Sequence, residues 1–216
     1  MYVVLELPDV KVSYNAFGSF WLNSMFVGGV SSDRQIQVLA STFVRLVESA
    51  IREYNMGVAR TKEYWRTHDK IALGAIQQAT SHFESCVSDM HRAVKFYTRL
   101  RRHPRLGPLS SINDQRPGFV SAAVHDQLRN TRNEIHHMEE LIMNGDVPLD
   151  KSVSIRADGP EIPHPSEQNQ TIKTIDRLSV GNCEIKAADI CDWLLEMAEF
   201  CELLNKHCGL RPEVVA

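Results

Sequence analysis

Apolar residues recur at spacings of three and four along four long stretches of this chain, and this pattern limits its fold more than any other feature. In the first stretch the repeating residues are Ile36, Leu39, Phe43, Leu46, Ala50 and Tyr54. This period places the side chains along one side of an α-helix. Ser32 and Gln35 form a capping-box pattern at its start, and Gly57 stands where a helix commonly stops. We therefore expect the first helix to run from Ser32 to about residue 56.

Three further stretches show the same period. The second begins near Lys70, and its repeating residues are Ile76, Ala79, Phe83, Cys86, Met90, Val94 and Tyr97. The third covers about 119–143, ahead of Asn144-Gly145, with Val124, Leu128, Ile135, Met138 and Ile142. The fourth covers about 184–207, ahead of Gly209, with Ile190, Trp193, Leu194, Met197, Cys201 and Leu204. Three long helices within 31–144 and a fourth within 184–208 predict an antiparallel four-helix-type bundle.

The remaining segments are expected to be extended or irregular. Residues 1–30 contain two short extended segments, 2–7 and 10–14, and then an apolar stretch that should pack on the bundle or in a dimer contact. Residues 58–69 are mixed and fit a short helix or a loop, and 103–118 fit a loop.

Residues 146–182 are broken by prolines and glycines, and they form the predicted insertion. Within them, 152–156 and 175–180 alternate apolar and polar residues, which is typical of a two-stranded β-ribbon. An isolated hairpin is marginal in water, so the ribbon should pack on the bundle or pair with the N-terminal segments. We predict one mainly α-helical domain over residues 1–216, with a small β-ribbon insertion and short N-terminal extended segments.

Composition narrows the function. The net charge of −3 argues against a general binder of polyanions, so a nucleic-acid surface would have to be a local patch. Five cysteines without a C-x-x-C pair favour reduced thiols in the cytoplasm. No basic signal leader or long apolar run is present, so we expect no membrane attachment. Phosphate-loop, G-x-S-x-G and H-E-x-x-H motifs are absent, and we predict no cofactor.

The third predicted helix has a polar face opposite its apolar one. At about 100° per residue, one arc of this helix contains His125, Arg129, Arg132, Asn133, His136 and His137. Arginine binds phosphate oxygens, and histidine transfers protons near neutral pH. The face therefore fits a site for a phosphodiester, and it also fits an ordinary solvated helix surface.

Part of this face resembles a known signature. Arg132-Asn133 followed by His137, with apolar Ile135 between them, is similar to the signature of the HEPN family of small helical-bundle domains. Arg129 with His136 satisfies a looser spacing, so two alignments stay open. Many nuclease members carry Tyr two positions after the His, where this chain has Glu139.

The resemblance implies a metal-independent endoribonuclease that uses the RNA 2′-hydroxyl as nucleophile, in a toxin–antitoxin or phage-defence setting. In that interpretation His137 is the general acid or base, Arg132 stabilises charge on phosphorus, and Asn133 orients the histidine or the phosphate. Arg132 and His137 lie about 140° apart on one helix, so the resemblance also implies a homodimer in which two signature helices face each other. A nucleotidyltransferase-type antitoxin would be the cognate partner.

The end of the second predicted helix is strongly basic. The residues that we expect to bind RNA there are Arg92, Lys95, Arg99, Arg101, Arg102 and Arg105. Cations are favoured at a helix C-terminus by its dipole, but this number exceeds what capping needs. Neutralisation of phosphates by Lys and Arg dominates affinity for nucleic acids, which favours an RNA-backbone role for this patch.

Two alternatives stay open. The first is a non-catalytic HEPN-like module that binds RNA, a nucleotide or a protein partner, which is favoured by the negative charge of Glu139 and Glu140 beside the signature. The second is a di-iron site built on Glu134 and His137, but a second Glu-x-x-His pair is missing, so we predict no metal. Histidines outside the signature, such as His91, lie in no motif and are expected on the surface or satisfied in the core.

Overall fold

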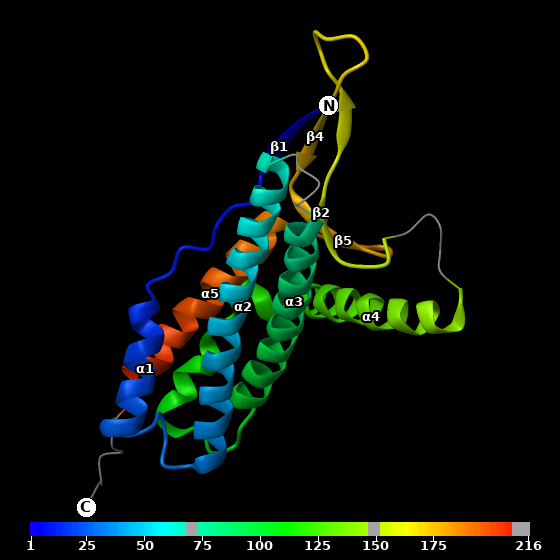
Figure 1. Cartoon of the computed structure of the whole chain (residues 1–216). Coiled ribbons are helices and arrows are strands. Elements are labelled where there is room, and N and C mark those ends of the chain that lie inside the picture. Colours follow the sequence, from blue (N-terminus) through cyan, green and yellow to red (C-terminus); the bar gives the residue numbers. More distant parts are fainter. Residues whose placement is uncertain (68–72, 147–151, 209–216) are drawn as a thin grey trace, which may run out of the picture.

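The computed structural model describes residues 1–67, 73–146 and 152–208 of the chain (Figure 1). Its helices are α1 (Tyr14–Phe26), α2 (Arg34–Thr67), α3 (Leu73–Arg101), α4 (Ala122–Asn144) and α5 (Ala187–Lys206). The long helices α2 and α3 form an antiparallel pair, with α5 and α1 on one side of it. The predicted mainly α-helical fold with a small β insertion is confirmed.

Aromatic side chains form the centre of the core where α2, α3 and α5 meet. The Tyr97 ring lies 4.6 Å from the Phe200 ring and 5.0 Å from the Phe119 ring, and Phe43 packs edge-on against Phe200 at 5.3 Å. All four are buried. This cluster fixes the end of α3 and the start of α4 relative to the rest of the bundle.

Helix α2 is longer than predicted, because Gly57 does not end it. The helix continues through residues 58–67, so the expected break and the loop alternative for this segment are both wrong. A Cβ atom at Gly57 would lie 2.6 Å from Phe83 Cε1. The glycine therefore allows α2 to approach the Phe83 ring on α3, which is a packing role. Lys70, the expected start of the next helix, lies outside the described residues.

The N-terminal segment differs from its prediction. Only Tyr2–Leu5 forms a strand (β1), and the extended segment expected at 10–14 is not paired as a strand. The Asn55 side chain satisfies the Val10 backbone instead, accepting from its N–H and donating to its carbonyl at 2.9 Å each. The apolar stretch that follows forms α1, which buries Phe17 and Phe20 and packs on α5.

Two three-stranded sheets form the β insertion together with the N-terminus. The strands are β2 (Arg156–Asp158), β3 (Glu161–Pro163), β4 (Thr171–Ile175), β5 (Arg177–Val180) and β6 (Cys183–Lys186). The expected ribbon corresponds to the antiparallel pair of β2 and β5, and β2 starts later than predicted. Of the two alternatives for this ribbon, packing on the bundle is confirmed, because β2 contacts α3 and β5 contacts α4 and α5. The N-terminal strand β1 instead runs parallel to β4 in the other sheet. Residues 183–186 form β6, so α5 begins at Ala187.

Helix α4 crosses the α2–α3 pair, and its C-terminal half extends past the bundle (Figure 1). The Ser121 side chain caps its start by accepting from the Val124 N–H, and Gly145 ends it in the left-handed conformation (φ 78°). The predicted end is therefore confirmed. The connection before it is not a simple loop, because it contains the 3₁₀ helices η2 (Gly107–Asp114) and η3 (Gly118–Val120). None of the helices in the described ranges has the length and apolar character needed to cross a membrane.

Candidate nucleic-acid interface

The polar face of α4 is divided between two different surroundings. Its N-terminal part lies against α3, where the His125 ring is 5.8 Å from the ring of His91. Arg129 and Arg132 are close enough to His91 to act on it electrostatically. Its C-terminal part, with His136 and His137, lies where α4 leaves the bundle. One helix face therefore contributes to two separate sites.

His91 is the residue whose environment the sequence failed to show. Its side chain is 2 % exposed, and neither ring nitrogen has a hydrogen-bond partner in the described structure. The expectation of a surface or a satisfied core histidine is therefore wrong for His91, which is buried and has no hydrogen-bond partner among the described residues. Burial, reinforced by the positive charge of Lys95 and of groups on α4, lowers the pKa of His91 to about 4. His91 is thus a neutral imidazole at neutral pH.

The three predicted catalytic residues do not converge within one chain. Arg132 and Asn133 are half-buried, whereas His137 is exposed. The His137 Nδ1 atom lies 3.2 Å from Glu140 Oε2, one turn further along the helix. Within the described residues, no hydrogen bond or ion pair joins His137 to Arg132 or Asn133. A catalytic site that uses both Arg132 and His137 therefore needs one of these residues from a second copy of the chain.

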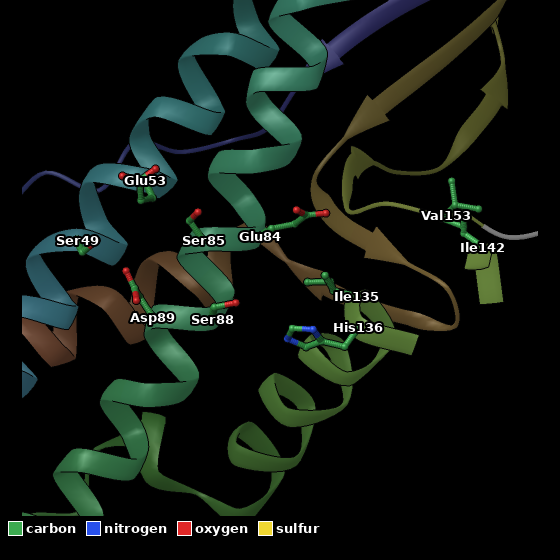
Figure 2. A pocket seen from close by; sticks show the side chains of 10 residues that line it. All are labelled: Ser49, Glu53, Glu84, Ser85, Ser88, Asp89, Ile135, His136, Ile142 and Val153. Carbon is green, nitrogen blue, oxygen red and sulfur yellow. The ribbon is translucent and has the colours of Figure 1, made fainter. Parts of the chain in front are cut away.

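The two alternate signature residues, Arg129 and His136, lie in different surroundings. Arg129 forms an ion pair with Asp126, with 3.0 Å between Nη2 and Oδ1. His136 lines a cavity of about 620 Å³ whose opposite wall carries Glu53, Glu84 and Asp89. Figure 2 shows the His136 side chain turned toward α3. Such a wall repels phosphate, so His136 is poorly placed to act on RNA.

The basic residues of α3 come together with the start of α4 in a cavity of about 530 Å³. We call it the basic cleft. Its charged lining residues are Lys95, Arg99, Arg102 and Asp126, and His125 also lines it. An adjoining cavity of about 460 Å³ shares Thr98, Arg102 and Val120 with it and adds Arg101 and Arg116. Positive charge thus extends from the middle of α3 to the connection before α4.

The six predicted RNA-binding residues are not equivalent. Lys95, Arg99 and Arg102 line the basic cleft, and Arg101 lines the adjoining cavity. Arg92 and Arg105 line neither cavity. They pair with acidic residues, Arg92 with Asp89 at 3.6 Å and Arg105 with Asp33 at 3.0 Å. Across the described chain, the side chains of Lys95 and Arg102 make no hydrogen bond or ion pair. Lys95 and Arg102 are therefore the strongest candidates to bind an anion.

The start of α4 adds to the positive potential of the basic cleft. Val120 and Ala122 line it, so the cleft lies at the N-terminal end of a 23-residue helix. Free N–H groups and the helix dipole favour anions there. Asp126 is the opposing charge in the lining, and its ion pair with Arg129 offsets it. The arrangement suits a phosphate group.

Of two further residues of this interface, Arg116 was not singled out from the sequence and His125 was named only as part of the polar face. Arg116 lies in an irregular connection without a motif, and it reaches the interface only because η2 and η3 fold back on α3. His125 belongs to the predicted polar face but not to the signature. His125 lies one turn after the α4 N-cap, and helix N-termini commonly bind phosphate. This position could have indicated the site from the sequence.

The described residues include no group of three His, Cys, Asp or Glu side chains arranged to hold a metal ion. Comparison of the chain with protein families, with curated proteins and with solved structures found no match.

Proposed function

We propose that this protein binds the sugar–phosphate backbone of RNA in the basic cleft. The observation that supports this proposal most strongly is the convergence of Lys95, Arg99 and Arg102 with the N-terminal end of α4. Two adjoining cavities with Arg102 in common provide room for successive phosphates of one strand. Thr98 and His125 in the lining provide hydrogen-bonding groups that can contact a 2′-hydroxyl, which distinguishes RNA from DNA.

Salt dependence tests the binding proposal directly. The anisotropy of a labelled single-stranded RNA should be measured between about 50 and 200 mM salt, the range in which counterion release changes affinity strongly. Each phosphate contact on a single strand contributes about −0.7 to the slope of log K against log salt. Arg102→Ala and Lys95→Ala should each weaken binding and reduce the slope by about this amount.

The matched control for these variants is Arg45→Ala, because Arg45 is exposed on α2 and lines neither cavity. It should leave affinity and slope unchanged. A slope that stays the same in Arg102→Ala and Lys95→Ala would show that the RNA lies elsewhere or does not bind. DNA of the same sequence should bind more weakly if the 2′-hydroxyl is contacted.

The geometry of α4 favours a second candidate, cleavage of RNA by a homodimer. The projecting half of α4 leaves His137 exposed and ends in the exposed apolar side chain of Met143 (83 %). A two-fold copy packed on this half brings His137 of one chain toward Arg132 of the other. His137 then takes the 2′-hydroxyl proton, and the 2′-oxygen attacks phosphorus. The P–O5′ bond breaks, and the 5′-oxygen takes a proton from water, giving a 2′,3′-cyclic phosphate and a 5′-hydroxyl.

Cleavage should be assayed in EDTA with wild type and with the variants Arg132→Ala, His137→Ala, His136→Ala and His125→Ala. The dimeric site predicts that only His137→Ala and Arg132→Ala abolish cleavage. Co-expressed Arg132→Ala and His137→Ala chains should recover about a quarter of the activity, since half of random dimers are mixed and each has one intact site. Loss on His125→Ala alone would instead assign the proton transfer to the basic cleft of a single chain.

A further inference from the structure

The cavity that contains His136 has two walls of different chemistry, and we call it the α3–α4 groove. Glu53 of α2 and Glu84 and Asp89 of α3 form one wall. Ile135 and Ile142 of α4 form the other, together with Val153 from the segment that follows (Figure 2). With a volume of about 620 Å³, the groove is large enough to bury several side chains of a ligand.

The Glu53 carboxyl of the acidic wall is held in its charged state. Burial alone would raise the pKa of Glu53, but hydrogen bonds with His82 (2.6 Å) and Arg52 (3.2 Å) outweigh it and lower the pKa. The Asp89 side chain is only 16 % exposed and has Arg92 at 3.6 Å. The remaining polar lining residues of α2 and α3 are serines, whose short side chains let a ligand approach these carboxylates closely.

Apart from His136, the second wall is apolar, and it is exposed at one end. Ile142 is 50 % exposed and Val153 is 40 % exposed. Both line the same end of the groove in Figure 2. Exposed apolar side chains are ordinary when they occur singly, but here they border a cavity and face fixed negative charges. A ligand that fits both walls needs an apolar side and a positively charged side.

We propose that the α3–α4 groove binds a basic amphipathic helix of a partner protein, with its apolar face on α4 and its Lys or Arg side chains on α2 and α3. This is the chemistry of helix-in-groove recognition. RNA is excluded from the groove because the carboxylates repel phosphate. The basic cleft of a second copy does not fit the groove, because Lys95, Arg99 and Arg102 line a concave surface and two concave surfaces do not interlock.

The probe is a labelled synthetic peptide of lysine and leucine, with leucines at helical spacing, whose binding to the full chain is measured by anisotropy. Ile142→Asp and Asp89→Lys should each weaken binding at least tenfold. The controls are Leu73→Asp and Asp192→Lys, two changes of the same chemistry on exposed residues that do not line the groove. Circular dichroism verifies that each variant is folded.

A charge swap makes the test specific. A peptide with glutamate in place of lysine should bind Asp89→Lys better than it binds wild type. A scrambled peptide of the same composition should bind at least tenfold more weakly than the amphipathic one. Equal binding of the scrambled peptide, or equal binding to wild type, Ile142→Asp and Asp89→Lys, would overturn the proposal. RNA binding should be unchanged in Ile142→Asp. The experiment therefore tests helix binding in the groove independently of RNA binding in the basic cleft.

Discussion

Replacing Gly57 with alanine tests the central packing contact of the long helices. In most helix interiors this change stabilises a protein, because glycine is about 0.5–1 kcal/mol less favourable than alanine there. At Gly57 the added Cβ would lie 2.6 Å from Phe83 Cε1 and 2.7 Å from Cδ1, so ring or backbone must move. Overpacking of this kind costs about 1–3 kcal/mol. The midpoints of these ranges predict a net destabilisation of about 1 kcal/mol.

Gly18 supplies the matched control. It lies inside α1, is exposed, and a Cβ atom there would meet no atom within 4 Å. Gly18→Ala should therefore stabilise the fold by about 0.5–1 kcal/mol. The free energies of unfolding of the two variants should therefore differ by about 2 kcal/mol, and this difference measures the cost of overpacking at Gly57.

Urea denaturation measures both effects as shifts in midpoint at constant m. The Gly57→Ala cost should fall when Phe83 is first replaced with leucine, because the contact then lacks its ring. If Gly57→Ala stabilises the protein as much as Gly18→Ala does, α2 does not press on Phe83 and the packing role of Gly57 is refuted. An unchanged cost in the Phe83→Leu background would place the clash on another neighbour.

Two further predictions concern α4 and its contact with α3. The pKa of His91 is lowered to about 4 in the fold and is near 6.5 when unfolded, so the unfolded chain binds more protons between these values and stability should fall as pH drops from 6.5 to 4. His91→Leu should reduce this fall, which thermal unfolding across the pH range would show, and an unaltered pH profile would contradict it. Ser121→Ala removes the α4 N-cap and should cost about 1 kcal/mol in urea denaturation, whereas Ser121→Asp should retain most of the stability.

Local features of the fold could be predicted because their causes are local. Apolar periodicity located all four long helices, and Asn144-Gly145 marked the end of α4 correctly. Gly57 misled the prediction, since a glycine that ends a helix and a glycine that admits a neighbouring ring look the same in sequence. The Asn55 contact that replaces strand pairing at Val10 spans 45 residues, and no local pattern announces it.

The candidate site could be predicted only in parts. The basic run on α3 was visible from composition, and half of its cations do line the basic cleft. The crossing of α4 over α3 and the positions of Asp33 and Asp89 determine which of these cations line the cleft. Both depend on the tertiary structure and cannot be predicted from a local pattern. His91 shows the same limit, because its burial without partners arises only from the crossing of α3 and α4.

The crossing of α3 and α4 forms two cavities, the α3–α4 groove and the basic cleft, whose opposite charges lie close together along α3. Asp89 lines the α3–α4 groove and Lys95 lines the basic cleft, six residues or about 9 Å further along the helix. That distance is close to the Debye length of about 8 Å at physiological ionic strength. RNA in the basic cleft and a cationic helix in the groove should therefore attract each other, so each should bind more tightly when the other is present. This coupling should increase at low salt and disappear in Lys95→Ala/Arg102→Ala, where the RNA is lost but the groove is intact.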